Sequence, residues 1–478
     1  MIDYMNTKES PQTWEITTLG EICAPPQYGW TTKANFEKGS IRLLRTTDIT
    51  SGKIDWASVP FCSICPANIS KYKLETNDIL ISRAGSVGTS ILLEDIPYDS
   101  VFASYLIRFR PIKPNDPKYI AYFLQTRKYW ESITERSSGI AMLNVNAQKL
   151  KTISIPVAPP EDQRKIVARI EELFSKLDAG KAALERVRAN LKRYRASVLK
   201  AAVDGLLTEE WRRQNPDVEP ASELLKRILV ERCRKWEETQ LSIYEKKGKL
   251  PPKGWKDKYP EPKAPDTSNL PPLPKGWTWA RSEQIGFTFG GLTKNPKRAK
   301  LPKQYPYLRV ANVYANELRL DNIEQIGVED SELEKLLLRA GDLLIIEGNG
   351  SKDQIGRLAI WDGSINPCVH QNHVIKIRPI ILALGKWILS WLLSPVGRYF
   401  IELVASSTSG LYTLSVNKVG DLLIALPSLT EQIQIIAEVE RRLSVLDDLE
   451  SVVSVNYHRA KRIRQSILKC AFERNLIS

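Results

Sequence analysis

The amino-acid sequence predicts an α+β protein in which two similar globular domains are joined by two long helices that form an antiparallel coiled coil. Three observations support this fold class. The chain has 478 residues, more than one hydrophobic core usually serves. It contains an internal repeat, and each copy of that repeat passes from short strand-like runs into a long heptad pattern.

The repeat is clearest near the end of each globular segment. Residues 138–146 (SGIAMLNVN) recur as residues 409–417 (SGLYTLSVN). After a loop of different length, residues 163–200 match residues 432–469 in one constant register. Such a long match indicates a duplication. Because the interior side chains of the two copies differ, we expect the two domains to recognise different targets.

The first part of each copy contains short apolar runs that Gly, Pro, Asn and Asp interrupt, a pattern that predicts strands and loops. Residues 77–81 (NDILI) correspond to residues 341–345 (GDLLI), and a glycine-bearing turn follows each run. Short helices are expected over residues 118–136 and 384–404.

The second part of each copy has apolar residues that alternate by fours and threes, as in the a/d seam of a coiled coil. Each helix alone could instead pack on its own domain. Two matched copies favour pairing with each other, and antiparallel pairing is preferred. Arg442 and Asn456 interrupt the second seam. The expected seam residues are Ile170, Leu173, Leu177, Leu184, Leu191 and Val198 in the first helix, and Val439, Leu446, Leu449, Val453, Ile463 and Ile467 in the second.

The repeat and the changes in composition set the expected boundaries. Within the linker, residues 219–247 have a charged helical pattern that could cover the paired helices or contact a partner, whereas residues 250–274 are rich in Pro and Lys and should be extended. The expected segments are a first globular domain over 1–158, a first long helix over 159–208, the linker over 209–270, a second globular domain over 271–430, and a second long helix over 431–478.

The composition favours a polyanionic partner. Lys and Arg total 69 against 55 Asp and Glu, a net charge of +14, so nucleic acid is the first partner to consider. A hydrophobic fraction of 42% excludes global disorder. The chain shows neither an apolar run long enough to span a membrane nor an apolar signal-peptide core near Met1. Its six cysteines are scattered, which indicates a reducing compartment, and we expect a cytoplasmic protein.

The sequence lacks the motifs of several enzyme classes. It has no GxxxxGK[ST] or GxGxxG loop, and no NPPY or DPPY tetrapeptide of an amino-methyltransferase. Cys62 and Cys65 lack a second CxxC, and His370 and His373 lie in the other half, so no metal site is expected. Asp342 and Glu347 lack the lysine of a nuclease motif and are better explained as structural carboxylates. The chain is therefore expected to bind and position, not to catalyse.

This arrangement resembles the specificity subunit of a type I restriction-modification system. The resemblance covers the whole chain, although the Pro/Lys-rich linker matches no functional motif of the family. It is carried by residues 139–146 and 410–417, by the Pro-rich turns into Asp162-Gln163 and Glu431-Gln432, and by the helix ends at Leu199-Lys200 and Leu468-Lys469.

The resemblance implies two target recognition domains, each reading one half of a bipartite, asymmetric sequence in double-stranded DNA. The helices would act as a ruler and dock two modification subunits, which use S-adenosylmethionine to methylate adenine. They would also dock restriction subunits that use ATP and Mg. This chain itself would bind no cofactor. The alternative is a non-catalytic coiled-coil scaffold with two protein-binding domains, which the surplus of positive charge disfavours.

A half-site read in the major groove requires Arg, Lys, Asn or Gln at base edges, with other cations on phosphates. The cluster over residues 295–303 is the densest. The candidate DNA-binding residues are Lys33, Arg42, Arg45, Lys53, Lys71, Lys73 and Arg83 in the first domain, and Lys294, Asn295, Lys297, Arg298, Lys300, Lys303 and Arg309 in the second.

Overall fold

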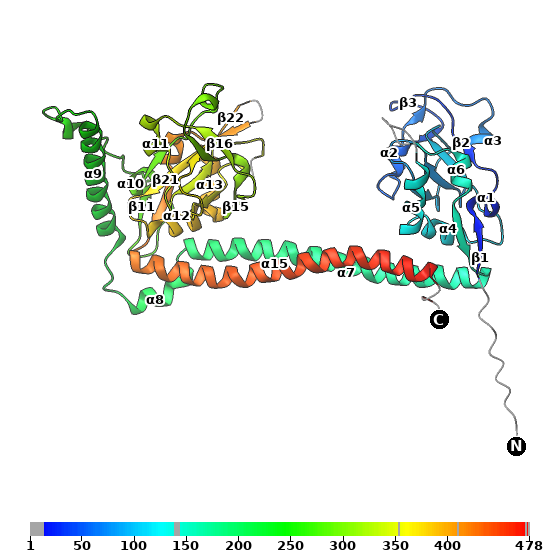
Figure 1. The fold of residues 1–478 in the computed structure, drawn as a ribbon. Coiled ribbons are helices and arrows are strands. Elements are labelled where there is room, and N and C mark those ends of the chain that lie inside the picture. The colour runs from blue at the N-terminus through cyan, green and yellow to red at the C-terminus, as the bar shows by residue number, and fades with distance from the viewer. Residues whose placement is uncertain (1–13, 138–143, 352–353, 409–410, 474–475, 477–478) are drawn as a thin grey trace, which may run out of the picture. The chain divides into compact units, whose positions relative to one another are not determined.

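A computed structural model describes residues 14–137, 144–351, 354–408, 411–473 and 476 (Figure 1). The chain forms two compact units, one made of residues 1–187 and 452–478 and the other of residues 188–451. Each unit therefore contains one globular domain together with a part of both long helices, α7 (Pro160–Val203) and α15 (Leu429–Phe472). Residues 138–143 and 409–410, which carry part of the repeat motif, lie outside the described residues.

The first unit is built on two four-stranded sheets, with a separate antiparallel pair at the base of the domain. One sheet has the order β2-β9-β6-β7, formed by Gln27–Tyr28, Leu106–Phe109, Ile79–Ser82 and Ser90–Leu92. The other has the order β3-β5-β4-β8, formed by Ala34–Asn35, Phe61–Cys62, Arg42–Leu44 and Ser100–Phe102. The pair joins β1 (Glu15–Thr18) to β10 (Ser154–Val157). The helices are α1 (Leu19–Ile22), α2 (Thr46–Ile49), α3 (Ile69–Tyr72), α4 (Pro117–Phe123), α5 (Arg127–Arg136) and α6 (Ala147–Lys151).

The second unit repeats this plan. Its main sheet has the order β12-β21-β17-β19, formed by Gly286–Phe289, Val374–Pro379, Leu343–Ile346 and Leu358–Ile360. The second sheet, β16-β13-β20, consists of Glu324–Gly327, Gln304–Leu308 and Val369–His370. The basal pair joins β11 (Thr278–Arg281) to β24 (Leu423–Leu426). The remaining strands are β14 (Val313–Tyr314) with β15 (Glu317–Leu318), and β18 (Gly348–Asn349), β23 (Leu411–Thr413) and β22 (Ser406–Thr408) in a third sheet.

The helices of the second unit are mostly short. The predicted helix over 384–404 is broken at Ser394, whose hydroxyl accepts the Gly397 N–H at 3.0 Å, and the one over 118–136 is broken in the same way near Thr126. The helices of this unit are α8 (Glu209–Gln214), α9 (Ala221–Lys246), α10 (Ser282–Ile285), α11 (Asp330–Leu336), α12 (Leu384–Leu393), α13 (Pro395–Val404) and α14 (Val416–Gly420), with 3-10 turns at Leu206–Thr208, Trp255–Lys258, Arg298–Lys300 and Val310–Asn312.

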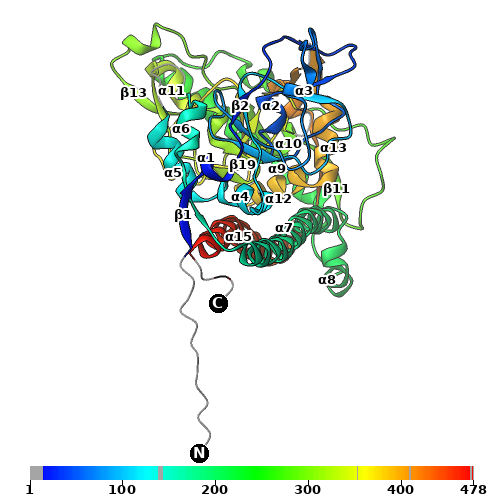
Figure 2. The same ribbon diagram turned by 90° about the vertical axis from the view of Figure 1, so that its right-hand side faces the viewer.

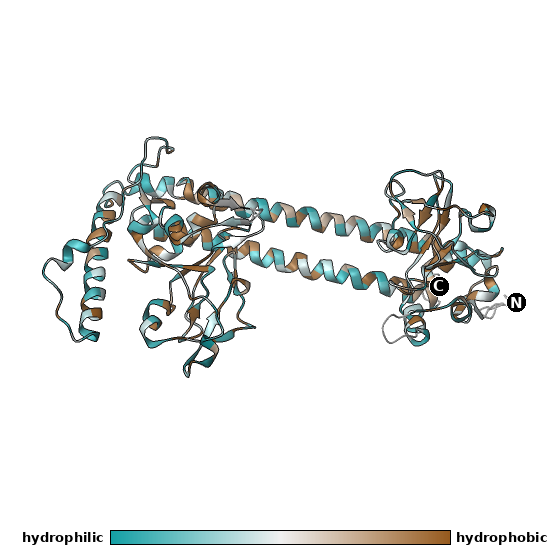
Figure 3. Cartoon of the chain, turned by 90° about the horizontal axis from the view of Figure 1, so that it is seen from above, coloured by the Kyte–Doolittle hydropathy of each residue, from teal (hydrophilic) through white to brown (hydrophobic). Residues whose placement is uncertain are grey.

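The central strands β6 and β17 are buried on both faces. Alternate residues of β17 belong to different clusters: Leu343 and Ile345 pack in the larger core, whereas Leu344 and Ile346 pack on the other side. This arrangement explains why residues 79–81 (ILI) and 343–346 (LLII) are continuously apolar and do not alternate with polar residues. Figure 3 shows the same concentration of apolar residues inside each sheet domain.

The two long helices are antiparallel (Figures 1 and 2). In the first unit, Ile170 of α7 shares a core with Leu468 near the end of α15. In the second unit, Val198 near the end of α7 shares a core with Val439 near the start of α15. The predicted antiparallel pairing is therefore confirmed.

The predicted seam is correct in part. Ile170, Leu191, Val198, Val439 and Leu446 are buried, and Leu173, Leu177, Leu184, Val453 and Ile467 are half-buried. The placement of Leu449 and Ile463 in the seam is wrong, because their side chains are 46% and 39% exposed.

The residues one position further along α15 take the places of Leu449 and Ile463. Glu450 and Arg464 are half-buried, and the guanidinium of Arg464 lies 3.9 Å from the ring of Phe174 in the first unit. A straight helix with ~3.6 residues per turn drifts by about 20° per heptad from a strict 3.5-residue repeat, so the contact face moves to the next residue over several heptads.

The linker packs on the second domain. Ala221, Leu224 and Ile228 of α9 belong to the core of the second unit. The buried Arg232 donates to the carbonyl of Glu283 at 2.9 Å and to the hydroxyl of Tyr259 at 2.7 Å. The helical segment therefore packs on its own domain, in a core that also includes the end of α7 and the start of α15. Its expected contact with a partner stays a prediction. Within the described part of the chain, no helix is both long enough and apolar enough to cross a bilayer.

Candidate nucleic-acid interface

The two units present equivalent loops at the end of the central strand. We call this set of residues the rim. In the first unit the rim is Arg83, which follows β6, with residues 103–105 before β9; in the second it is Glu347, which follows β17, with residues 371–373 before β21. In the first unit the Arg83 N–H donates to the carbonyl of Tyr105 at 2.9 Å, and the Val145 N–H donates to the carbonyl of Arg83 at 3.0 Å. In the second unit the same pattern holds for Glu347, His373 and Leu414 at 2.9 and 2.7 Å. The rim backbone is thus the same in both domains.

The rim of the first unit is cationic and aromatic. The Arg83 guanidinium lies over the ring of Tyr28 at 5.0 Å, and the hydroxyl of Tyr28 accepts the Ala147 N–H at 2.9 Å. Among the described residues, no carboxylate lies within ion-pair distance of Arg83, and its buried Nε finds no hydrogen-bond acceptor. Tyr105 is 58% exposed beside it. Arg83 therefore keeps its charge available to a partner.

The rim of the second unit is acidic and amide-bearing. An oxygen of Glu347, Oε2, lies 2.9 Å from Nδ1 of His373, and Nε2 of His373 lies 3.4 Å from Nδ2 of Asn372. Gln371 accepts the Val310 N–H at 3.3 Å through its side-chain oxygen. The Glu347 side chain is 30% exposed and that of His373 is 54% exposed. The same scaffold position therefore carries opposite charge in the two domains.

A buried carboxylate lies at the start of each central strand. Asp342 accepts two hydrogen bonds from Arg378 at 2.6 and 2.7 Å, and Asp78 accepts two from Arg110 at 2.7 and 3.0 Å. Because Asp342 precedes β17 and Glu347 follows it, a four-residue strand separates them. At ~3.3 Å per residue the two carboxylates lie too far apart to share a metal ion. The structural interpretation of Asp342 is thus supported, whereas Glu347 is a rim residue.

Two titratable side chains behind the second rim are fully buried. Nζ of Lys376 donates to the carbonyls of Lys335 and Leu337 at 2.8 and 2.9 Å, and burial, together with the nearby Arg378, lowers the pKa of Lys376 to about 7. Burial also lowers the pKa of His370 to about 3. His370 is buried and His373 is exposed, so this pair does not converge on one ligand. Throughout the described residues, no cluster of three or more His, Cys, Asp or Glu side chains could hold a metal ion.

The candidate cations of the first domain fall into two groups, those that already bind another group of the protein and those that do not pair with a described carboxylate. Arg42 donates to the carbonyl of Val59 and stacks on Phe61 at 4.1 Å. Arg45 pairs with Asp48 at 2.7 Å, and Lys73 pairs with the exposed Asp99 at 2.8 Å. The second group is exposed, and no described carboxylate pairs with its members, which are Lys33, Lys53 and Lys71.

The basic cluster of the second domain is divided in the same way. Arg298 binds both oxygens of Glu332 at 2.9 and 3.1 Å, and its side chain is only 14% exposed. Asn295 accepts the N–H groups of Lys297 and Arg298, so it stabilises the turn. Lys297 and Lys300 are exposed and pair with no described carboxylate. The other candidates form ion pairs: Lys294 and Arg309 with Glu324, and Lys303 with Asp330.

Sequence reasoning misses most of the rim. Arg83 is among the candidates, but Tyr105, Asn372 and His373 are not, nor is Tyr28, which lies under Arg83. Glu347 is expected there only as a structural carboxylate. One signal could have identified the acidic position: Arg83 and Glu347 each follow the matched NDILI and GDLLI runs closely and differ in charge.

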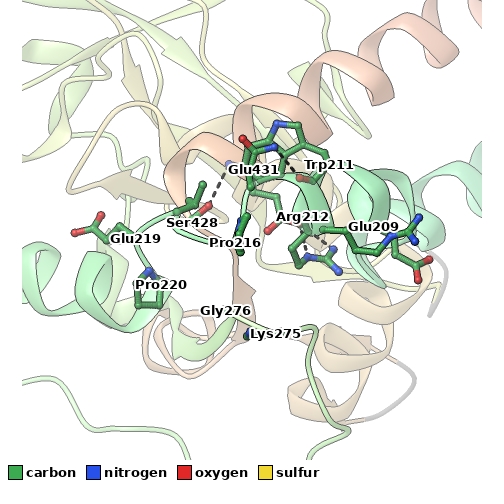
Figure 4. Close-up of a pocket in the computed structure, with 13 residues that line it drawn as sticks. Glu209, Trp211, Arg212, Pro216, Glu219, Pro220, Lys275, Gly276, Ser428 and Glu431 are labelled. Carbon is green, nitrogen blue, oxygen red and sulfur yellow. Dashed lines mark hydrogen bonds and ion pairs between the residues drawn. The ribbon is translucent and has the colours of Figure 1, made fainter.

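A cavity of about 660 Å³ lies in the second unit beside the start of α15 (Figure 4). Next to it, the buried Glu431 accepts hydrogen bonds from Thr208 at 2.7 Å, from Arg212 at 2.9 and 3.0 Å, and from the indole of Trp277 at 2.9 Å. These bonds connect the segment after α7, the approach to β11 and the first turn of α15. The hydrogen bonds to Glu431 therefore have a structural role, because they connect these three segments of the second unit.

A duplicated sheet domain whose matched rims carry different side chains, followed in each copy by a long helix, defines a two-domain recognition protein. Residues 11–188 match the family model described as type I restriction modification DNA specificity domain. The chain is 25% identical to the type I restriction enzyme EcoKI specificity subunit of Escherichia coli K12, covering 99% of this chain and 91% of that protein. It is 24% identical to the StySPI specificity subunit of Salmonella potsdam, with the same coverage.

The fold of this chain matches that of a solved structure from work on the structural basis of complex assembly and conformational transition of the type I R-M system. Its TM-score is 0.59 at 17% identity, and the match covers 97% of this chain and 98% of that one. The chain is therefore similar over nearly its whole length to type I restriction enzyme specificity subunits, and its first part matches the DNA specificity domain of that system. The expected resemblance is confirmed.

Proposed function

We propose that this chain is the DNA-recognition subunit of a type I restriction-modification complex, and that each unit reads one half of a bipartite, asymmetric site in double-stranded DNA. One observation carries the proposal. The two units repeat the same backbone hydrogen bonds around the rim, yet their rims hold Arg83 and Tyr105 in one case and Glu347 and His373 in the other. Two identical readers would be expected of a symmetric site, whereas two different readers fit an asymmetric one.

The charge of the protein supports DNA as the ligand. The net charge is +14. Exposed lysines without a described carboxylate partner occur in both domains, Lys33, Lys53 and Lys71 in the first and Lys297 and Lys300 in the second. Lysines of this kind can neutralise phosphates and release condensed counterions. They would supply affinity, and the rim side chains would supply sequence preference.

Specificity subunits are the non-catalytic components of their complexes, so chemistry belongs to partner subunits in this proposal. Modification subunits would bind S-adenosylmethionine and methylate adenine, and restriction subunits would use ATP and Mg. The long helices offer a docking surface because several apolar side chains on them are exposed: Ile433, Val445 and Leu449 in the second unit are 56%, 55% and 46% exposed. Similarity to type I restriction enzyme specificity subunits disfavours the alternative of a scaffold with two protein-binding domains.

The test is to co-express the chain with its modification subunits and to map N6-methyladenine in host DNA. We expect a split motif with a fixed spacer. Replacing residues 12–158 with the corresponding domain of a related subunit should change one half of that motif and leave the other half unchanged. If no new methylation appears, or if the replacement changes both halves, the proposal is wrong.

A further inference from the structure

We propose that Arg83 and Glu347 are the equivalent base-reading residues of the two domains, an assignment that rests on the proposed function. Arg83 reads a guanine in the half-site of the first domain. Glu347 reads a base that presents an exocyclic amine in the major groove, cytosine or adenine, in the half-site of the second domain.

The equivalence follows from the backbone. Both the N–H and the carbonyl of each residue are held by matching bonds, so the side chains leave the same point of the same scaffold. The next residues also correspond, because Ala84 bridges Asn144 and Gly348 pairs with Thr413. Position along the strand therefore does not distinguish the two residues; their side-chain chemistry does.

The buried pairs provide an internal comparison. Where a charge is needed for folding, the two copies have the same residues: Asp78 with Arg110, and Asp342 with Arg378. At the rim the two copies hold opposite charges on an identical backbone. The scaffold therefore does not require either side chain at the rim, and the difference is available for recognition.

The environment of Arg83 suits guanine recognition. Its guanidinium is held over Tyr28 at 5.0 Å, and no described carboxylate competes for it. A planar guanidinium fixed on an aromatic ring presents its remaining N–H groups as a rigid fork, which matches O6 and N7 of guanine. Holding the side chain in place before binding also reduces the entropy lost when the base is bound.

The environment of Glu347 suits a base with an exocyclic amine. A carboxylate repels phosphates, so a partly exposed glutamate on a DNA-facing rim is useful only if it accepts a hydrogen bond from a base. The imidazole of His373 orients Oε2 at 2.9 Å, and Oε1 has no hydrogen bond within the described residues. Oε1 is therefore the atom that accepts from cytosine N4 or adenine N6.

The experiment compares the base preferences of single variants in cells that co-express the full chain with its modification subunits. Each host genome is sequenced for N6-methyladenine. Arg83→Gln should reduce the preference for guanine at one position of the first half-site by on the order of 10- to 100-fold. Glu347→Met, which has a similar length but no accepting oxygen, should do the same for the amine-bearing base of the second half-site. Every other position should keep its preference.

Matched controls are Arg127→Gln and Glu334→Met. Arg127 is 88% exposed and pairs with Glu131 in the first unit, and Glu334 is 62% exposed and pairs with Lys246 in the second. These variants remove the same charges from elsewhere on the same domains and should leave every base preference unchanged. Co-purification with the modification subunits and circular dichroism establish that each variant is folded.

The outcomes separate the two proposals. If the unaltered chain directs no split motif, the proposed function itself is wrong. If it directs one and the folded rim variants keep every preference, the assignment of Arg83 and Glu347 is overturned. A uniform loss of methylation at all positions would also overturn it, because that result is expected of a phosphate contact.

Discussion

The double substitution of Lys297 and Lys300 by Ala gives the sharpest test of the DNA interface in the second domain. Sequence alone would count three phosphate contacts in this cluster, including one from Arg298. The structure removes Arg298 from the count, because both of its terminal nitrogens bind Glu332. The two exposed lysines remain.

The magnitude follows from counterion release. Each phosphate contact contributes about −0.9 to the slope of log K against log salt. Loss of two contacts should therefore flatten the slope by about 1.8. The ratio of the DNA affinity of the unaltered protein to that of the double variant should then fall about 12-fold between roughly 50 and 200 mM salt. A loss of three contacts would flatten the slope by about 2.7.

The assay is fluorescence anisotropy with a duplex that carries the mapped site, using the chain in complex with its modification subunits. Substitution of both lysines by Arg is the charge-preserving control and should retain the slope. Arg298→Ala should instead destabilise the second domain by on the order of 1–2 kcal/mol, because it removes a two-pronged ion pair. An unchanged slope in the Lys-to-Ala double variant would show that this cluster does not contact DNA.

Two further predictions concern the buried charges of the second domain. Asp342→Asn should destabilise the second domain by about 3–5 kcal/mol in urea unfolding, because it leaves the Arg378 charge without its partner; a change well under 1 kcal/mol would contradict this account. The folded pKa of Lys376 is about 7, below its usual 10.5, so the unfolded chain binds more protons between these values and stability should rise with pH across this window. Lys376→Met should flatten that rise in urea titrations at several pH values, and parallel curves for the two proteins would show that Lys376 does not cause it.

The fold class and the duplication can be recognised in the amino-acid sequence without tertiary information. Apolar runs, turn residues and heptads are local patterns, and the repeat displays each of them twice. This is why the repeat alone assigns residues 77–81 and 341–345 to equivalent strands. The two long helices are predictable for the same reason, since a period of three and four residues requires no long-range contact to be recognised.

The availability of individual charges, in contrast, is set by tertiary contacts. Lys297 and Arg298 are neighbours in sequence, yet Glu332 pairs with Arg298 and leaves Lys297 exposed. The same holds for Leu449, whose place in a heptad does not reveal that α15 presents Glu450 to its partner helix. The physical reason is that ion pairing and side-chain burial depend on residues far apart in the chain, and the fold alone brings these residues together.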